Sequence, residues 1–118
     1  MSELTLTVTT AGQGAVMAIR GDLDFHSAPR VREALADLRL APGGRLVLDL
    51  GGLTFCDSSG ISVLVAAHNH TQGLRAETVL ADVPTGVSRI LGVVGLERVI
   101  AQYADTRAAT AGWTQAAT

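Results

Sequence analysis

The chain has 118 residues, of which 47% are apolar and 17% are charged, and its formal net charge is −2. This balance excludes a disordered chain, which would have few apolar residues and a large net charge, and the length predicts one domain with one hydrophobic core. The nine basic residues are all arginine, and they provide no electrostatic footprint for binding DNA or RNA. The four aromatic residues are scattered along the chain, so they form no base-stacking platform.

The first half of the chain predicts a hairpin, a helix and a buried strand. Residues 4–10 alternate apolar and threonine side chains, which indicates a half-buried strand. A short glycine-containing turn leads to a second strand at 15–20, and so short a connection favours an antiparallel pair. Residues 21–24 are expected to form a loop, and Ser27 is a good N-cap for the helix that follows. The apolar segment 45–50 predicts an interior strand.

The second half predicts alternating helices and strands. In chain order they are a loop or short strand extension at 51–57, a helix from about Ser58 to Thr71, a strand at 76–80, a helix opened by Pro84 and ended by Gly95, a strand at 98–103 and a weak helix capped by Asp105. We expect residues 112–118 to fray. The order predicts one α/β domain over 1–118, with its core at about 4–110. An N-terminal β-hairpin is followed by alternating helices and strands, which form a mostly parallel mixed sheet with helices packed on it.

Residues 49–64 (DLGGLTFCDSSGISVL) are the segment of the sequence that is most informative about function. A buried strand leads through a tight turn into a helix whose first residues are 57–60. A helix start leaves about four backbone N–H groups unpaired and carries roughly half a positive charge. A serine there can act as an N-cap, and a phosphate there is stabilised by the same groups. Phosphate at this position is therefore expected to change the surface charge without unfolding the domain.

Three motifs in this order resemble the STAS domain of bacterial anti-sigma factor antagonists. The run FCDSSGISVL at 55–64 resembles the family signature that opens the second helix, and 21–24 (GDLD) and 95–96 (GL) resemble two further elements. The resemblance covers roughly residues 4–110 and implies the STAS fold. It also implies that Ser58 is the phosphorylation site; the alternative is that Ser58 is a plain N-cap. Ser59 is a less favoured site of modification.

The resemblance implies a binding module and not an enzyme. The unphosphorylated form would bind an anti-sigma factor, itself a serine kinase, and so release the sigma factor. Phosphorylation at Ser58 would switch the antagonist off, and a serine phosphatase would reset it. The protein would act in the bacterial cytoplasm, without a cofactor, a nucleic acid or a membrane as partner. The alternative is a non-switching STAS module, either a stress-complex scaffold or a soluble subunit of a lipid transporter.

Residues around the DSSG turn are expected to contact the partner. They are Asp24, Asp57, Ser59, Gly60, Ser62 and Val63. For Asp24 the alternative is a structural role as the cap of its loop. For Asp57 the alternative is a carboxylate that the helix dipole stabilises. A helical projection with Ile61 at the centre of the buried face places Val63 on the opposite, exposed side. An exposed apolar residue beside a serine switch suits a protein partner; the alternative is a scattered surface residue.

An enzyme with Ser58 or Ser59 as nucleophile is the rival interpretation. The sequence has no G-x-S-x-G elbow, and only His26 could approach as a base. His68 and His70 are two residues apart and do not share a helix face, so no metal site is expected. Apart from the DSSG turn, the sequence has no glycine-containing loop suited to a phosphate, so nucleotide binding is not predicted.

The single cysteine, Cys56, cannot form an internal disulfide, which suits a reducing cytoplasm. It is expected to be a small buried residue, with a redox switch as the alternative. The N-terminus lacks the basic and apolar regions of a signal peptide, and no apolar run is long enough to span a membrane.

Overall fold

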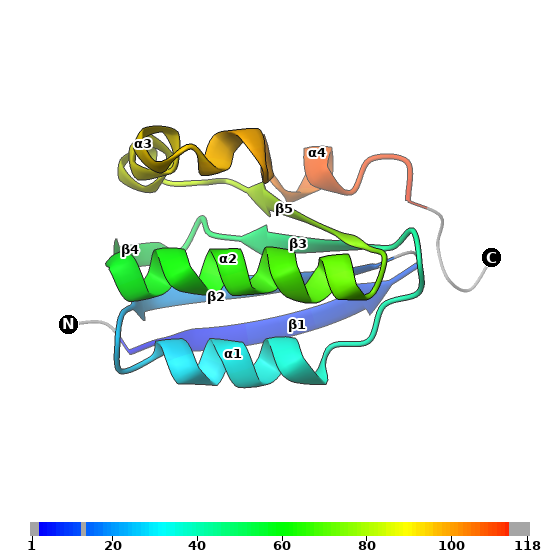
Figure 1. The fold of residues 1–118 in the computed structure, drawn as a ribbon, viewed down its shortest axis with the longest axis horizontal. Coiled ribbons are helices and arrows are strands. Elements are labelled where there is room, and N and C mark those ends of the chain that lie inside the picture. Colours follow the sequence, from blue (N-terminus) through cyan, green and yellow to red (C-terminus); the bar gives the residue numbers. More distant parts are fainter. Residues whose placement is uncertain (1–2, 13, 114–118) are drawn as a thin grey trace.

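Apolar strands and one-sided helices build a mixed sheet with helices on both of its faces (Figure 1). The computed structural model describes residues 3–12 and 14–113. The elements are β1 (Thr5–Ala11), β2 (Gly14–Leu23), α1 (Ala28–Asp37), β3 (Arg45–Asp49), β4 (Leu53–Cys56), α2 (Ser58–Gly73), β5 (Glu77–Ala81), α3 (Thr85–Val94), a 3-10 turn (Leu96–Arg98), β6 (Ala101–Tyr103) and α4 (Thr106–Ala109). No helix in this described part of the chain is long and apolar enough to cross a membrane.

The strand order confirms the predicted hairpin and the mostly parallel sheet. The five strands of the main path run β1-β2-β3-β5-β6; β1 and β2 are antiparallel and the other pairs are parallel. The sixth strand, β4, pairs in parallel with the end of β2 and sets Cys56 opposite Leu23. This pairing brings the start of α2 next to the end of β2.

Side chains of the interior strands alternate between two apolar layers. On β3, Leu46 and Leu48 are fully buried in the larger layer, which α1, α2 and α3 cover. Val47, between them, faces the smaller layer under α4, with Ala109. The period-two alternation of a strand therefore explains why so apolar a segment forms an interior strand.

The structure departs from the predicted elements where distant segments pair. β2 continues to Leu23, although residues 21–24 were expected to be a loop, because β4 supplies a second partner for it. The last strand is only three residues long, because the 3-10 turn occupies the chain before it. Gly95 ends α3 in the left-handed region at φ +81°, which confirms the predicted glycine cap. The expected fraying concerns residues that lie mostly outside the described part, at 114–118.

Candidate functional site

The start of α2 is capped by Asp57, and Ser58 is its first helical residue. The Asp57 Oδ1 atom accepts hydrogen bonds from the backbone N–H of Ser59 at 2.8 Å and of Gly60 at 3.2 Å. The alternative that Ser58 is a plain N-cap is therefore wrong, because the cap lies one position earlier. The Ser58 side chain is exposed and Ser59 is half-buried. The helix thus begins on a carboxylate cap, a contact worth about 1 kcal/mol.

Gly60 holds α2 close to β2 and β4 and takes no part in the surface. A Cβ atom at this position would stand 2.5 Å from the Cys56 sulfur and 3.0 Å from the Leu23 carbonyl oxygen. Glycine is therefore needed for this close approach. Gly60 was predicted to contact a partner; the structure shows it buried by these neighbours.

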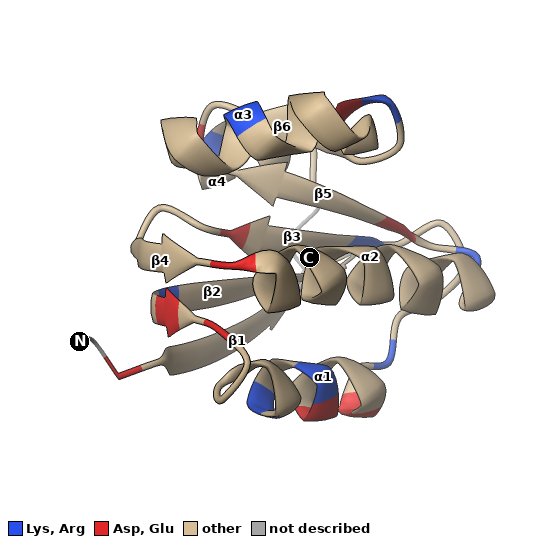
Figure 2. Ribbon diagram, turned by 60° about the vertical axis from the view of Figure 1, so that its left-hand side comes forward, with Lys and Arg blue, Asp and Glu red and all other residues tan. Residues whose placement is uncertain are grey.

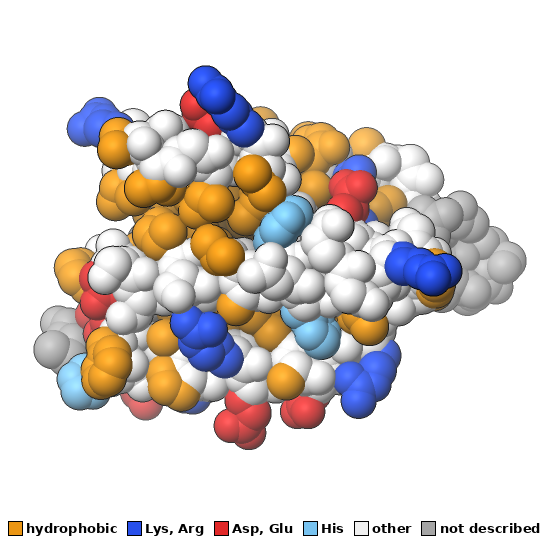
Figure 3. Space-filling view, viewed as in Figure 1, with side chains coloured by type: hydrophobic (Ala, Val, Ile, Leu, Met, Phe, Trp, Pro, Cys, Tyr) orange, Lys and Arg blue, Asp and Glu red, His pale blue; other side chains and the backbone are white. Residues whose placement is uncertain are grey.

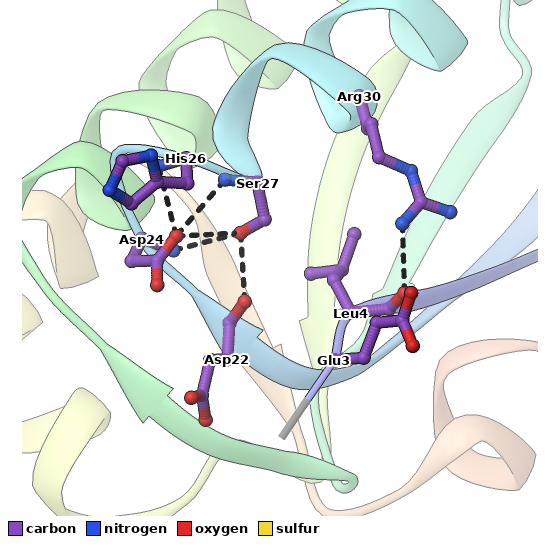
Figure 4. A pocket seen from close by; sticks show the side chains of 7 residues that line it. All are labelled: Glu3, Leu4, Asp22, Asp24, His26, Ser27 and Arg30. Atoms are coloured by element: carbon purple, nitrogen blue, oxygen red, sulfur yellow. Dashed lines mark hydrogen bonds between the residues drawn. The ribbon is translucent and has the colours of Figure 1, made fainter. Parts of the chain in front are cut away.

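Asp24 organises the turn between β2 and α1 (Figure 4). Its Oδ1 atom accepts from the backbone N–H groups of His26 and Ser27, both at 3.0 Å. Hydrogen bonding to the Ser27 backbone lowers the pKa of the Asp24 carboxyl, because it favours the charged form. Ser27 is the N-cap residue of α1 but its side chain does not cap the helix; its hydroxyl donates to the Asp22 carbonyl at 2.7 Å instead.

This turn lines a shallow cavity of about 360 Å³ at the sheet end, which Glu3 and Arg30 also line. The Asp57 backbone N–H donates to the Leu23 carbonyl at 3.3 Å, so Asp24 lies beside the cap of α2. Figure 2 shows acidic residues where β2 leads into α1 and where β4 leads into α2. The structure therefore brings Asp24, Asp57 and Ser58 to one end of the sheet.

Val63 faces the core, and its predicted exposure is wrong. Its side chain is 0% exposed. The buried residues of α2 are Gly60, Val63, Leu64, Ala67 and Thr71. Ile61, the expected centre of the buried face, is only half-buried. Apolar residues occur on nearly every side of the first three turns, so their spacing does not select one face, and α2 packs against both α1 and the sheet.

Ser62 is exposed, as its predicted place on the surface requires, and accepts a hydrogen bond from Arg32 Nη2 on α1 at 3.0 Å. Nothing in the sequence singles out Arg32, because this contact joins two helices that are distant in the chain.

An apolar groove lies between β4 and α3, and one of its lining residues, Cys56, comes two residues before Ser58 in the chain. Its volume is about 270 Å³. Its lining residues are Leu53, Thr54, Phe55, Cys56, Pro84, Gly86, Val87 and Ile90, and none of them is charged. Phe55 is 52% exposed and Ile90 is 40% exposed. Figure 3 shows hydrophobic side chains gathered between α2 and α3 on this face. Neither residue was among those that the sequence predicted at the site.

The three histidines lie in separate surroundings. The His26 ring packs edge-on against Phe25, and His70 Nε2 lies 3.3 Å from the Leu38 carbonyl oxygen. Within residues 3–12 and 14–113, no group of three or more histidine, cysteine or acidic side chains is placed to hold a metal ion.

Cys56 is half-buried, and burial raises the pKa of its thiol to about 11, with a smaller contribution from the Asp57 carboxylate. The thiol is therefore neutral at physiological pH, and the nucleophilic thiolate that a redox switch needs is scarce.

We expect Cys56 to react slowly with iodoacetamide in the folded protein. A thiol pKa of about 11 in place of the ordinary 9.0 lowers the thiolate fraction at pH 8 by about 100-fold. Rates are measured by mass spectrometry at pH 8, with the urea-unfolded chain as control. The folded-state rate should keep rising with pH above 9, whereas equal rates in both states at pH 8 would contradict the assigned environment.

Comparisons with known proteins agree with this architecture. The family model of the STAS domain matches residues 5–109. An anti-sigma-B factor antagonist of Listeria monocytogenes is 30% identical over 82 residues, which cover 70% of this chain and 72% of that protein. The crystal structure of an anti-sigma factor antagonist from Mycobacterium paratuberculosis has a TM-score of 0.72 at 23% identity and covers 92% and 93% of the two chains. The phosphorylated form of the Bacillus cell fate determinant SpoIIAA has a TM-score of 0.67 at 17% identity, with coverages of 91% and 96%.

Proposed function

Because the chain belongs to the STAS domain family, we propose that it is an anti-sigma factor antagonist which phosphorylation at Ser58 switches off. The unphosphorylated form binds an anti-sigma factor that is also a serine kinase, and the sigma factor is released. The kinase then phosphorylates Ser58 and the complex dissociates, until a serine phosphatase removes the phosphate. This cycle takes place in the cytoplasm, and the protein is a substrate and binding module within it, not an enzyme.

The observation that carries this proposal is the exposed hydroxyl of Ser58 at the first position of a helix that another residue caps. A kinase can reach the hydroxyl without disturbing the fold. Because Asp57 already binds the N–H groups of Ser59 and Gly60, a phosphate on Ser58 does not have to replace a cap. It adds close to two negative charges to a surface that stays folded.

The apolar groove between β4 and α3 supplies the surface for the anti-sigma factor. Interfaces combine an apolar centre with a polar rim, and here Phe55 and Ile90 form the centre. The polar residues Asp57, Ser58 and Ser59 follow the lining residue Cys56 along the chain, whereas Asp24 lines the cavity at the end of β2 and Ser62 faces α1. Docking of a partner over this end of α2 would take a phosphate on Ser58 out of water, and desolvating a charged group is costly. The phosphate therefore opposes docking through its charge alone.

Phosphorylation by the cognate anti-sigma factor tests this proposal. We expect incubation with the kinase and ATP to place one phosphate on Ser58, located by peptide mass spectrometry, and we expect Ser58→Ala to remain unmodified. Ser62→Ala is the matched control and should be phosphorylated normally. Phosphate found only on Ser59 or Ser62 would overturn the site, and a chain that the kinase binds but never phosphorylates would favour the non-switching alternative.

A further inference from the structure

We propose that Arg32 is the cation that pairs with a phosphate on Ser58. The inference rests on the proposed function, because it requires a phosphate at that residue. In the unmodified protein the Arg32 guanidinium is held on α2 through its 3.0 Å hydrogen bond to Ser62 Oγ. It is therefore already placed on the neighbouring helix, one turn from the serine that would carry the phosphate.

The geometry of the two helices brings Arg32 within reach of Ser58. Residues four apart share a helix face, so Ser58 and Ser62 lie one above the other, about 6 Å apart along the axis. α1 and α2 pack side by side and run in the same direction (Figure 1). Side chains of a helix tilt toward its N-terminus, so the Arg32 side chain leans toward the Ser58 end of α2. A turn of its flexible stem would move the guanidinium from the hydroxyl of Ser62 to a phosphate at residue 58.

The other charges at this end of the sheet give a phosphate little support. On its own helix, Asp57 is negative and occupies the N–H groups of residues 59 and 60. The turn between β2 and α1 contributes Asp24, a carboxylate with a lowered pKa, and His26. β4 contributes no charged side chain. The charged side chain of β5, Glu77, lies at the far end of α2 and is paired with Arg45 at 3.0 Å.

Arg32 is better placed than the other arginine near the start of α1. Arg30 turns away from α2 and donates to the Leu4 carbonyl at 2.9 Å. An arginine–phosphate pair is charge-assisted and can be bidentate, which is stronger than the present bond to a neutral hydroxyl. Phosphorylation would thus move one side chain and leave both helices in place.

The second ionisation of the phosphate tests this pairing directly. Phosphoserine is incorporated at position 58 through an expanded genetic code, and its pKa is measured by ³¹P NMR titration. We expect a pKa below the ordinary value of about 6 in the parent chain, and Arg32→Gln should raise it by about half a unit or more, because the nearby positive charge is lost. Arg107→Gln, the matched control on the opposite face of the sheet, should change it by no more than about 0.1 unit.

Equal titration curves for the parent chain and Arg32→Gln would overturn the pairing. A second measurement needs no variant that removes the charge: the ¹⁵N signal of the Arg32 side chain, assigned through Arg32→Lys, should shift when residue 58 carries phosphate, and an unchanged signal would likewise overturn it. Neither readout depends on a kinase. Failure of the proposed function, a kinase that leaves Ser58 unmodified, is therefore distinguishable from failure of this inference.

Discussion

Glutamate in place of Val63 is expected to unfold the domain. The side chain at this position is 0% exposed, and it packs in the layer between α2, α1 and the sheet. A charge buried there without a partner costs several kcal/mol, which is comparable to the total stability of about 5–15 kcal/mol of a typical domain. Circular dichroism and urea denaturation measure the effect.

Val93→Glu is the matched control for this experiment. It makes the same chemical change in a helix, but at a position that is 83% exposed, and should alter the free energy of unfolding by no more than about 0.5 kcal/mol. If Val63→Glu unfolded at the same urea concentration as Val93→Glu, residue 63 would lie on the surface as the helical projection predicted, and the packing of α2 described above would be wrong.

The sequence predicted the helices and strands well where residues close together in the chain determine them. The alternation of Leu4, Leu6 and Val8 with threonines marks β1, and the glycine turn after it marks the antiparallel hairpin. Gly95 marks the end of α3, because a left-handed residue is needed there. Asp105 was expected to cap the last helix, and its side chain accepts from the Ala108 N–H at 2.8 Å. Each of these features depends on residues close together in the chain.

The face of α2 and its cap could not be predicted in the same way. Aspartate and serine are about equally good N-caps, so the DSSG turn does not say whether residue 57 or 58 takes that place. The apolar side chains of Ile61 and Val65 share one face of the helix, whereas Val63 points to the opposite side. Only the packing of α1 and the sheet against α2 decides which of them is buried.

The surface around Ser58 is built by segments far apart in the sequence. The groove joins Phe55 on β4 to Ile90 on α3, and the hydrogen bond between Arg32 and Ser62 spans 30 residues. A single sequence contains no periodic signal for such contacts. The family resemblance pointed to Ser58 in the sequence. The residues around Ser58 could be identified only from the three-dimensional structure.

Phosphate on Ser58 is expected to weaken binding of the anti-sigma factor by at least about 100-fold, or about 2.7 kcal/mol. The group brings close to two negative charges to the first residue of α2, beside the Asp57 carboxylate and two positions after Cys56, which lines the uncharged groove. Since the helix cap does not depend on Ser58, the backbones of the modified and unmodified forms should be nearly superimposable. Ser58→Asp should weaken binding less than phosphate does, because one carboxylate carries less charge.

Titration calorimetry of the cognate anti-sigma factor against three forms of the chain tests this switch most directly. The forms are the unmodified protein, Ser58→Ala and the chain with phosphoserine incorporated at position 58. The account predicts that the first two bind with equal affinity and that the third binds at least about 100-fold more weakly, with an unchanged circular dichroism spectrum. Equal binding by the phosphoserine form, or weak binding that accompanies a loss of helical signal, would contradict a switch that acts through charge at Ser58.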